Sequence, residues 1–336
     1  MVGALVVDDE GVIVGRGAHR IAGGPHAEVV ALEDAGPHAR GATLYCTLEP
    51  CSHTGRTGPC APLVSKAGIR RAVVAMDDPH PLVNGRGLAH LRERGVDVTV
   101  GVEREAAERQ NAAFLTGILE RRPYIILKVA LSVDGCVAAA PGARTTLTGP
   151  AASRRVQRQR AEVDAIGVGS GTILTDDPLL TARGAYRSRP LTRIIFDRRL
   201  RTPPSAKVFM SLDSGPIIVV SSDRTRSSAP DRAAALSAAG AQLLVPAEDD
   251  LRSACRAIYG AGVTSLVLEG GPALYSAALT SDLVDAIDFY VAPRRIGSGG
   301  VPWLDAGRVA WETFTERRAQ WLGKDLLIQA HVYGHR

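Results

Sequence analysis

Short apolar runs alternate with amphipathic segments along the first 120 residues. Runs rich in β-branched residues and bounded by turn residues predict strands, and apolar residues at helical spacing predict helices. The expected strands cover residues 3–7, 12–15, 42–47, 71–76 and 96–100. The expected helices cover residues 26–34, 61–67 and 87–94. The first two strands form a hairpin, and the later alternation of strands with helices indicates an α/β domain with parallel pairing.

Residues 103–122 have the spacing of one amphipathic helix, and Pro123 breaks the pattern before a new strand begins. We therefore expect two domains, the first covering residues 1–121 and the second residues 122–336. The second domain repeats the α/β rhythm, with expected strands at residues 124–133, 165–168, 193–197, 217–221, 265–268, 286–292 and 326–332. Its expected helices lie near residues 151–160, 231–239, 250–259 and 272–280. Turn and charged residues predict loops at residues 183–190 and 222–230.

Composition supports a globular protein that acts on small anionic molecules. At roughly 150 residues per domain, 336 residues suggest two domains, and 45% apolar residues supply sizeable cores. The net charge of +5 is too small to demand nucleic acid but suits anionic small molecules. The densest basic cluster is either a solvated helix face or a contact to a phosphorylated ligand, and it comprises Arg154, Arg155, Arg158 and Arg160.

The number of cysteines and the N-terminal sequence indicate in which cellular compartment the protein lies. Five cysteines are too few, and odd in number, for a disulfide framework, so they fit metal binding or a reducing compartment. The N-terminus lacks the charged and apolar regions of a signal peptide, and no apolar run reaches membrane-spanning length. We expect a soluble cytoplasmic protein with no membrane partner.

Two stretches hold the ligands for a catalytic metal. The first is Pro25-His26-Ala27-Glu28, and the second, CTLEPCSHTGRTGPC, spans residues 46–60. His26, Cys51 and Cys60 supply three ligands for tetrahedral Zn²⁺ and leave one position for water. Glu28 would then carry a proton from water to a leaving amine, the logic of zinc deaminases of nucleobases. The alternatives are a structural zinc clip or a buried free thiol. The remaining cysteines are interpreted as core residues: Cys46, Cys136 and Cys255.

The spacing of the cysteines narrows the substrate. Base deaminases usually have two residues between these cysteines, whereas eight residues separate Cys51 from Cys60. The longer loop brings His53 and Arg56 to the rim, where both can hold an anionic or polar substrate. The alternative is that both are exposed loop residues.

The second domain has two further candidate features. Residues 128, 130, 132 and 134 share one face of the expected strand, so Lys128 and Asp134 would line a cleft, unless the strand is simply half exposed. Residues 268–272 predict a strand, a tight turn and a helix start, where glycine N–H groups suit a phosphate, although an ordinary turn has the same pattern. The stretch from Gly167 to Thr172 does not match the G-x-G-x-x-G fingerprint, so the residues alone assign no hydride donor.

Six motifs resemble those of a known family. PHAEVVAL, TLEPCSHTGRTGPC, DDPHPLVNGRG, KVALSVDG, TILTDDPLLTAR and LEGGPAL occur in the order seen in the RibD family, the bifunctional deaminase–reductases of riboflavin biosynthesis. The resemblance spans nearly the whole chain. It implies a cytidine-deaminase-like three-layer α/β domain followed by a dihydrofolate-reductase-like domain. It also implies one Zn²⁺ per chain, NADPH as hydride donor, and association of chains through the reductase domain.

The implied reactions act in sequence on small phosphorylated pyrimidines. The first domain would deaminate 2,5-diamino-6-(5-phosphoribosylamino)pyrimidin-4(3H)-one, and the second would reduce the ribosyl chain of 5-amino-6-(5-phosphoribosylamino)uracil to ribityl. By the resemblance, the zinc ligands are His26, Cys51 and Cys60. The catalytic residues are Glu28, Lys128 and Asp134. Substrate contacts fall on His53, Arg56, Arg160, Leu180, Arg183 and Glu269, and cofactor contacts on Thr172, Asp176 and Gly271.

The chain departs from the family pattern at three places. It lacks the N-terminal helix and the N-P-x-V-G stretch before the first strand, from which we expect a true start upstream. Residues 144–148 replace a Ser-x-Trp-Ile-Thr pattern, and Gly58 replaces a proline. Two other functions stay open: a deaminase of nucleosides or nucleic acid, and a pseudo-enzyme with one working site. The low aromatic content of 4% disfavours single-strand binding.

Overall fold

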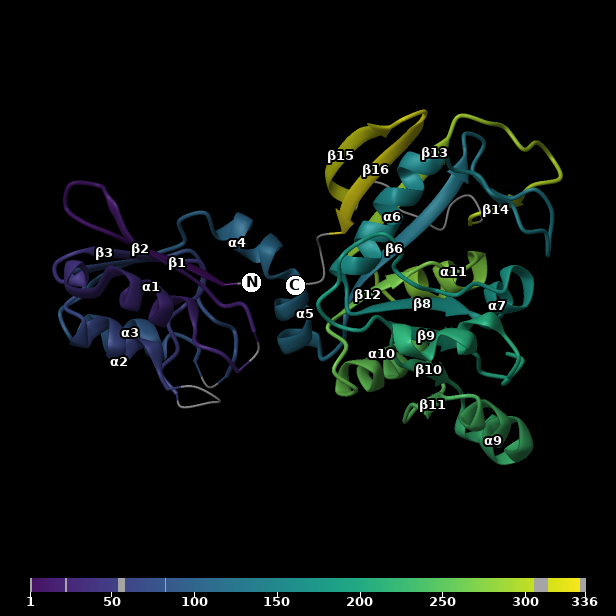
Figure 1. The fold of residues 1–336 in the computed structure, drawn as a ribbon, viewed down its shortest axis with the longest axis horizontal. Coiled ribbons are helices and arrows are strands. Elements are labelled where there is room, and N and C mark those ends of the chain that lie inside the picture. Colours follow the sequence, from purple (N-terminus) through teal and green to yellow (C-terminus); the bar gives the residue numbers. More distant parts are fainter. Residues whose placement is uncertain (1, 22, 54–57, 82, 305–313, 333–336) are drawn as a thin grey trace. The chain divides into compact units, whose positions relative to one another are not determined.

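The chain folds into two compact units. The computed structural model describes residues 2–21, 23–53, 58–81, 83–304 and 314–332. The units are Met1–Glu120 and Arg121–Arg336, and each has its own sheet and its own cores (Figure 1).

The first unit is built on a five-stranded mixed sheet in the order β2-β1-β3-β4-β5. The strands are β1 (Gly3–Val7), β2 (Ile13–Ala18), β3 (Thr43–Cys46), β4 (Arg71–Val74) and β5 (Asp97–Val100). β1 and β2 form the predicted hairpin. The expected parallel pairing holds for β3, β4 and β5, but β1 pairs antiparallel with β3.

Three helices pack on one face of this sheet and enclose an apolar core (Figure 1). They are α1 (Ala27–Ala35), α2 (Cys60–Lys66) and α3 (Arg86–Glu93), and a short 3-10 turn, η1 (Gly36–Ala39), follows α1. α1 lies very close to β2 because Gly15 and Gly17 have no side chains. A Cβ at Gly17 would lie 1.9 Å from the Ala27 carbonyl oxygen. This close approach fixes the start of α1, where His26 and Glu28 lie.

The segment predicted as one helix over residues 103–122 is two helices. They are α4 (Arg104–Gln110) and α5 (Ala112–Glu120). Asn111 leaves helical geometry, with φ −103° and ψ 15°, and its buried side-chain amide donates to the Ala107 carbonyl at 3.0 Å. Asn competes for backbone hydrogen bonds in this way, which favours a helix end over a helix interior.

The second unit is built on a nine-stranded sheet in the order β11-β10-β9-β8-β12-β6-β13-β16-β15. Seven of these strands are β6 (Tyr124–Ser132), β8 (Ala165–Gly169), β9 (Thr192–Phe196), β10 (Ile217–Val220), β11 (Ala241–Leu244), β12 (Ser265–Leu268) and β13 (Ala286–Ala292), all parallel. The antiparallel pair β15 (Phe314–Leu322) and β16 (Asp325–Val332) completes the sheet. A separate two-stranded sheet joins β7 (Cys136–Ala138) to β14 (Val301–Pro302). The sequence patterns did not reveal β7, β11, β14 or β15.

Helices cover the nine-stranded sheet, and apolar cores lie between the layers. They are α6 (Pro150–Glu162), α7 (Ser170–Asp176), α8 (Asp223–Ser228), α9 (Pro230–Ala238), α10 (Leu251–Gly260) and α11 (Pro272–Thr280), with the 3-10 segment η2 (Lys207–Ser214). The loop predicted at residues 222–230 is wrong, because α8 forms there. Ser222 caps it by accepting a hydrogen bond from the Thr225 N–H at 3.2 Å, an N-terminal signal present in the sequence.

The strand that carries Lys128 is shorter than predicted. β6 ends at Ser132, so Asp134 lies in the following turn and not on the strand face shared by Lys128. Gly135 has φ 78°, a left-handed conformation that a glycine adopts without strain, and the chain reverses direction there. Val133 is consequently exposed and does not contribute to the core.

Candidate active sites

Three metal-ligand side chains meet at the N-terminal ends of α1 and α2. His26 precedes α1, Cys60 begins α2, and Cys51 lies in the loop between β3 and α2. The His26 Nδ1 atom lies 3.2 Å from Cys60 Sγ and 3.4 Å from Cys51 Sγ. Ligand atoms bound to one tetrahedral zinc are roughly 3.5 Å apart. All three ligand atoms lie within 4.8 Å of one another, so this soft donor set fits one zinc ion.

The two ligand thiols have pKa values that shift in opposite directions. The Cys60 N–H donates to Cys51 Sγ at 3.4 Å. Hydrogen bonding to the Cys60 thiol lowers the pKa of Cys51 to about 5. The same contact, together with burial, raises the pKa of Cys60. Metal binding requires the deprotonated thiolate form, which the lowered pKa of Cys51 favours.

Glu28 lies beside the ligands, in the first turn of α1, and is 2% exposed. Burial raises the pKa of its carboxyl group to about 7. Its Oε2 atom is buried and has no hydrogen-bond partner among the described residues. A buried carboxyl oxygen that lacks a partner is costly unless a ligand or water supplies one. This orphaned oxygen therefore favours a catalytic site over a purely structural metal clip.

The predicted rim residue His53 is half-buried beside this site. Its ring stacks on that of His80, with centroids 5.9 Å apart and an angle of 5° between the planes. Its Nδ1 atom is buried and has no hydrogen-bond partner among the described residues. Arg56, the other predicted rim residue, lies outside the described residues.

Sequence reasoning missed Glu49, which lies two residues before the ligand Cys51 and binds the backbone of residues 78–88. Its carboxylate is 3% exposed and accepts four backbone hydrogen bonds, three of them at the start of α3. The donors are the N–H groups of Asp78, Gly85, Gly87 and Leu88, at 2.8 to 3.3 Å. A carboxylate is stabilised at a helix N-terminus by these N–H groups and by the helix dipole. The available signal was an acidic residue fixed directly before Pro50-Cys51.

In the second unit, three predicted residues meet over the sheet: Lys128 of β6, Arg160 of α6 and Glu269 after β12. Arg160 Nε donates to Glu269 Oε1 at 2.7 Å, and Arg160 Nη2 donates to Glu269 Oε2 at 2.8 Å. The Lys128 ammonium lies 3.7 Å from Glu269 Oε2. Burial alone would raise the pKa of Glu269, but the charges of Arg160 and Lys128 outweigh it and lower the pKa to about 2. Of the basic cluster, Arg160 points to this site while Arg154 and Arg158 are exposed.

A buried polar network that the sequence did not reveal extends from this group. The Lys128 ammonium lies 5.8 Å from the centre of the Tyr290 ring. The Tyr290 hydroxyl donates to Gln159 Oε1 at 3.4 Å, and Gln159 Nε2 donates to Asp288 at 2.5 Å. Gln329 donates to the other Asp288 oxygen at 3.0 Å. Burial raises the pKa of Asp288, and these two amides stabilise its charged form.

Asp134 makes a different set of contacts. Its carboxylate accepts from the Ser132 hydroxyl at 2.6 Å and from the N–H groups of Ile296 and Gly297, the latter at 2.8 Å. The hydroxyl of Ser132 and these N–H groups hold the pKa of Asp134 below its ordinary value. Asp134 therefore ties the turn after β6 to the loop after β13, and no described contact joins it to Lys128.

The predicted cofactor residues lie at the carboxyl ends of neighbouring parallel strands. Thr172 and Asp176 belong to α7, which follows β8, and Gly271 caps α11 after β12. A Cβ at Gly271 would meet no atom within 4 Å, and no side chain caps α11. Such a helix start beside a crossover between strands suits the phosphates of a dinucleotide. Burial raises the pKa of Asp176, and the charge of Arg144 opposes that shift.

The remaining predicted residues, Leu180 and Arg183, lie on the loop that follows α7. Leu180 is buried and has a left-handed φ of 53°. The Arg183 side chain is exposed, but its backbone N–H donates to Gln157 Oε1 at 2.7 Å. Arg160 Nη1 donates to the Thr181 carbonyl at 2.9 Å. The structure thus joins this loop to the end of α6 and to Arg160.

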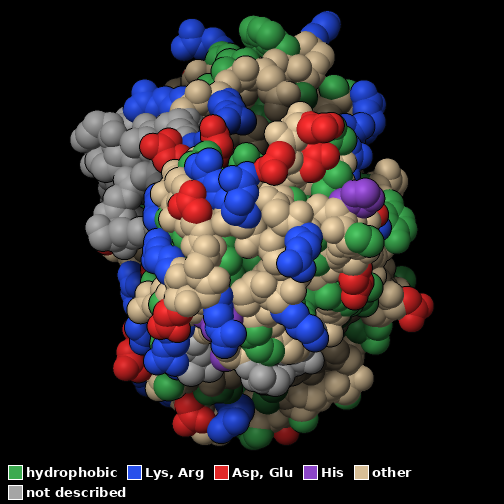
Figure 2. Space-filling model, turned by 90° about the vertical axis from the view of Figure 1, so that its left-hand side faces the viewer, with side chains coloured by type: hydrophobic (Ala, Val, Ile, Leu, Met, Phe, Trp, Pro, Cys, Tyr) green, Lys and Arg blue, Asp and Glu red, His purple; other side chains and the backbone are tan. Residues whose placement is uncertain are grey.

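The distribution of surface charge and the length of the helices bear on whether the chain binds nucleic acid or a membrane. Figure 2 shows Lys and Arg side chains interspersed with Asp and Glu side chains over one face of the molecule, and not one continuous basic surface. Nucleic-acid binding usually requires clustered basic residues. Across the described ranges, no helix is long and apolar enough to cross a membrane.

Comparisons with known proteins match each of the two units to a protein family. Residues 1–76 match the family model of the cytidine and deoxycytidylate deaminase zinc-binding region, and residues 123–328 match that of the RibD C-terminal domain. The chain is 38% identical over 333 residues to the riboflavin biosynthesis protein RibD of Aquifex aeolicus, covering 97% of this chain and 90% of that protein.

Two solved structures resemble this chain over nearly its whole length. RibD of Acinetobacter baumannii superposes with a TM-score of 0.84 and 33% identity, covering 99% of this chain and 92% of that one. The Thermotoga maritima protein described as a diaminohydroxyphosphoribosylaminopyrimidine deaminase/5-amino-6-(5-phosphoribosylamino)uracil reductase has a TM-score of 0.84 and 30% identity, with coverages of 98% and 91%. The predicted fold class is confirmed: a cytidine-deaminase-like domain precedes a reductase domain. The chain belongs to the RibD family of riboflavin biosynthesis proteins.

Proposed function

We propose that this chain catalyses two consecutive reactions of riboflavin biosynthesis. The first unit removes the 2-amino group of 2,5-diamino-6-(5-phosphoribosylamino)pyrimidin-4(3H)-one. The second unit uses NADPH to reduce the ribosyl chain of 5-amino-6-(5-phosphoribosylamino)uracil to ribityl. The description of the Thermotoga maritima relative, which covers both activities, supports the proposal together with the residues at both sites.

Hydrolytic deamination requires an attacking water and a protonated leaving group. His26, Cys51 and Cys60 would hold the zinc ion, which, when bound, lowers the pKa of water toward ~7. Glu28 accepts a proton from the attacking water and delivers it to the departing amino group. The carbon–nitrogen bond breaks, ammonia leaves, and the former amino carbon becomes a carbonyl. The raised pKa of Glu28, about 7, suits a group that both takes and gives a proton.

Substrate binding in the first unit involves the rim of this site. His53 has an unpartnered buried nitrogen, and we propose that it donates to or accepts from the pyrimidine. We propose that Arg56, from the same loop, contacts the anionic part of the substrate. Glu49, two residues before Cys51, holds the segment 78–88 through four N–H groups, and we propose that this contact fixes the loop that carries Cys51.

Reduction in the second unit opens the ribosyl ring. When bound, NADPH supplies the hydride that forms a new C–H bond at C1′. The C1′–O4′ bond breaks, and O4′ takes a proton to become a hydroxyl group. We propose the Lys128 ammonium as the proton donor, since it lies beside Arg160 and Glu269, the proposed substrate contacts.

The other proposed roles in this unit follow from position. Leu180 and Arg183 contact the substrate from the loop joined to Arg160. Thr172, Asp176 and Gly271 contact the cofactor at the carboxyl ends of β8 and β12. Asp134 remains a proposed catalytic residue, and its contacts indicate that it acts by holding the turn next to β6.

The single observation that carries the proposal is the convergence of His26, Cys51 and Cys60 beside Glu28, whose buried Oε2 atom has no partner among the described residues. The test supplies purified protein with the diaminopyrimidine ribosyl phosphate, with and without NADPH, and separates the products. We expect the deaminated pyrimidine without NADPH and the ribityl product with it. Recovery of unchanged substrate under both conditions would contradict the proposal.

We further propose that the chain is cytoplasmic and forms a homo-oligomer through its second unit. This proposal rests on the family resemblance, because relatives of this type commonly associate through the reductase domain. Light scattering on the full-length protein gives the oligomeric state, and a monomeric mass at micromolar concentration would contradict it.

A further inference from the structure

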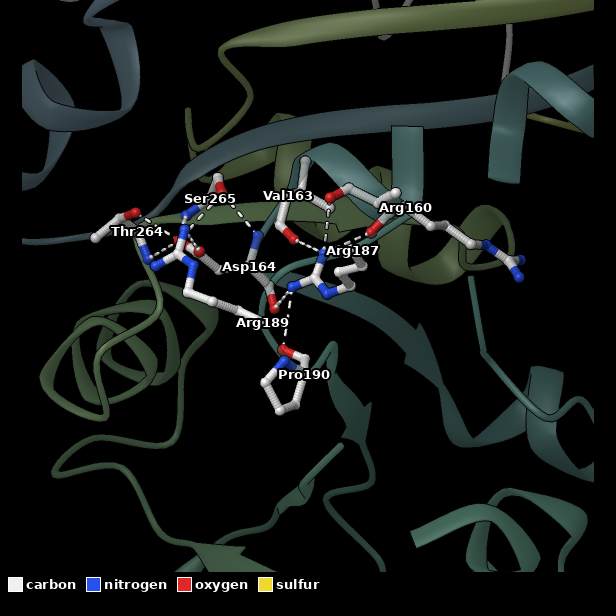
Figure 3. A network of polar contacts seen from close by, with 9 residues as sticks. Arg160, Val163, Asp164, Arg187, Arg189, Pro190, Thr264 and Ser265 are labelled. Carbon is white, nitrogen blue, oxygen red and sulfur yellow. Dashed lines mark hydrogen bonds and ion pairs between the residues drawn. The ribbon is translucent and has the colours of Figure 1, made fainter. Parts of the chain in front are cut away.

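One arginine outside the proposed sites binds the backbone carbonyl groups at the C-terminal end of α6. Arg187 lies on the loop after α7, and its guanidinium points at the last carbonyl groups of the helix (Figure 3). Its Nη1 atom donates to the carbonyl oxygens of Arg160, Ala161 and Val163, the first two at 2.8 and 3.1 Å. Its Nη2 atom donates to the carbonyls of Asp164 and Pro190, at 3.3 and 3.1 Å.

This contact replaces an ordinary helix cap. The last turn of a helix leaves carbonyl groups without intrahelical partners, and a left-handed glycine often satisfies them. α6 has no such glycine, because its C-cap residue is Val163 in extended geometry, with φ −107° and ψ 161°. The planar guanidinium fork of Arg187 satisfies these carbonyls instead, and its positive charge is favourable at a helix C-terminus.

The same turn of α6 carries Arg160, whose position is fixed from both ends. Arg187 binds the backbone carbonyl of Arg160, while Glu269 and the Thr181 carbonyl bind its side chain. Thr181 and Arg187 belong to one loop, so this loop contacts both the helix end and the guanidinium of Arg160. Displacing Arg187 would therefore loosen the backbone of Arg160 and the loop that carries Leu180 and Arg183.

We propose that Arg187 is a positioning residue for the reductase, which holds Arg160 and the 180–183 loop in the geometry that binds the phosphorylated ribosyl substrate. This inference rests on the proposed reductase function. It assigns Arg187 an effect on substrate binding in the second unit alone, with no role in binding NADPH or in deamination.

Neighbouring Arg189 provides a matched control. Its side chain is 77% exposed, and its Nη2 atom pairs with Asp164 Oδ1 at 3.1 Å (Figure 3). Asp164 keeps its hydrogen bonds from Thr264 and Ser265 when that pair is lost. Arg189→Ala therefore removes one arginine from the same loop and leaves the carbonyls at the end of α6 bound.

The experiment compares the full-length wild type with Arg187→Ala, Arg187→Lys and Arg189→Ala. Reduction is measured with 5-amino-6-(5-phosphoribosylamino)uracil and NADPH, and deamination is measured in parallel. We expect Arg187→Ala to raise the KM for the pyrimidine at least tenfold, and to change the KM for NADPH and the deamination rate less than twofold. Arg187→Lys should give an intermediate KM, because an ammonium keeps the charge but not the fork. Arg189→Ala should resemble the wild type.

The double variant Arg160→Ala/Arg187→Ala distinguishes positioning of Arg160 from a general stabilisation of the fold. If Arg187 acts through Arg160, Arg187→Ala adds less than twofold to the KM in an Arg160→Ala background. An equal tenfold rise in both backgrounds overturns the proposal, and so does a lowered melting temperature with an unchanged KM. If Arg187→Ala does not fold, the same comparisons with Arg187→Lys decide.

Hydrogen exchange supplies a readout that does not depend on activity. Amides of residues 158–164 should exchange at least tenfold faster in Arg187→Ala or Arg187→Lys than in Arg189→Ala. Unchanged exchange overturns the proposal whether or not the wild type reduces the substrate. A different result is possible, in which the Arg187 variants exchange faster but the wild type does not reduce the substrate. That result would contradict the proposed function and would still support the contact between Arg187 and α6.

Discussion

Arg160 and Glu269 form a two-point ion pair in which both guanidinium–carboxylate distances are below 3 Å, at 2.7 and 2.8 Å. The side chains are only 14% and 8% exposed, and the Lys128 ammonium is the third charge in the group. Three charges this deeply buried are stable only together, because removing one leaves the others without compensation. The pair therefore links substrate binding in the second unit to its stability.

Replacing Glu269 by Gln should make the stability of the second unit less dependent on pH in the acid range. The folded-state pKa of Glu269, about 2, lies below the ordinary value of 4.5, so its ionised form stabilises the fold. That stabilisation is fully present above pH ~4.5 and is lost as the pH falls toward ~2. We expect Glu269→Gln to lower the free energy of unfolding by about 3 kcal/mol at pH 7. Urea unfolding monitored in the second unit at pH 7, 4 and 3 measures it.

The difference between wild type and Glu269→Gln should shrink across that acid range. Glu162→Gln is the matched control, since Glu162 is 62% exposed and pairs with Arg155 at the surface. A difference that stays constant from pH 7 to pH 3 would show that the charge of Glu269 does not contribute.

Glu28→Gln should separate proton transfer from metal binding. Gln has nearly the same shape but cannot accept and release a proton, so we expect deamination to fall about 10³-fold. Zinc content should stay near one per chain, because Glu28 is not among the ligand atoms. The deamination rate and the zinc content of the purified variant measure the two effects.

Glu33→Gln is the control for this substitution, because Glu33 lies on the same helix and is exposed. It should leave both deamination and zinc content unchanged. Loss of zinc in Glu28→Gln would mean that Glu28 is a ligand and that its proposed role is wrong.

Much of the metal site could be predicted because its chemistry is encoded in short sequence motifs. His26 and Glu28 are two residues apart at a helix start, and a proline precedes each ligand cysteine. These local features predict both the ligands and the elements that carry them. Glu49 was missed because its role depends on N–H groups about 30 to 40 positions away, which no local pattern reveals.

Removing the metal should affect the two activities differently. Cys60→Ser replaces a buried thiol with a hydroxyl group, a poor ligand for zinc, so zinc content should fall well below one per chain. Deamination should be lost, while reduction of the deaminated pyrimidine should continue, since no described metal ligand lies in the second unit. The two reactions are assayed separately with their own substrates.

Cys46→Ser is a control for this variant, because Cys46 is buried in the core and is not a ligand. It should cost stability but retain zinc. If Cys60→Ser keeps a full complement of zinc and deaminates normally, the assigned ligand set is wrong.

Gly87→Ala should destabilise the first unit through the contact that Glu49 organises. A Cβ at Gly87 would lie 1.9 Å from the Pro50 carbonyl oxygen, so the start of α3 would have to move away from the Glu49 carboxylate. We expect the free energy of unfolding to fall by about 2–4 kcal/mol. Urea unfolding measures it, with Gly58→Ala as control because a Cβ there meets nothing within 4 Å. Equal stability of the two variants would refute the steric argument.

The fold of the second unit was predicted less completely than its site. The parallel strands stand out as continuous apolar runs, but β15 contains charged residues and was not recognised as a strand. The polar network of Tyr290, Gln159 and Asp288 joins two distant segments of the chain, so only the folded structure brings it together. Asp134 was placed on a strand face because alternation was extended two residues beyond the end of β6.

Lys128→Ala should impair reduction and spare deamination. Removing the ammonium leaves the Glu269 carboxylate paired with Arg160 alone and takes away the proposed proton donor for the ribosyl oxygen. General acid catalysis contributes roughly 10²–10⁴-fold, so we expect kcat for reduction to fall by at least about 10²-fold. NADPH oxidation with 5-amino-6-(5-phosphoribosylamino)uracil measures it, and Lys207→Ala, at an exposed ion pair with Asp177, is the control. Normal kcat in Lys128→Ala would remove Lys128 from the reaction and leave the ion pair of Arg160 and Glu269 as a binding element only.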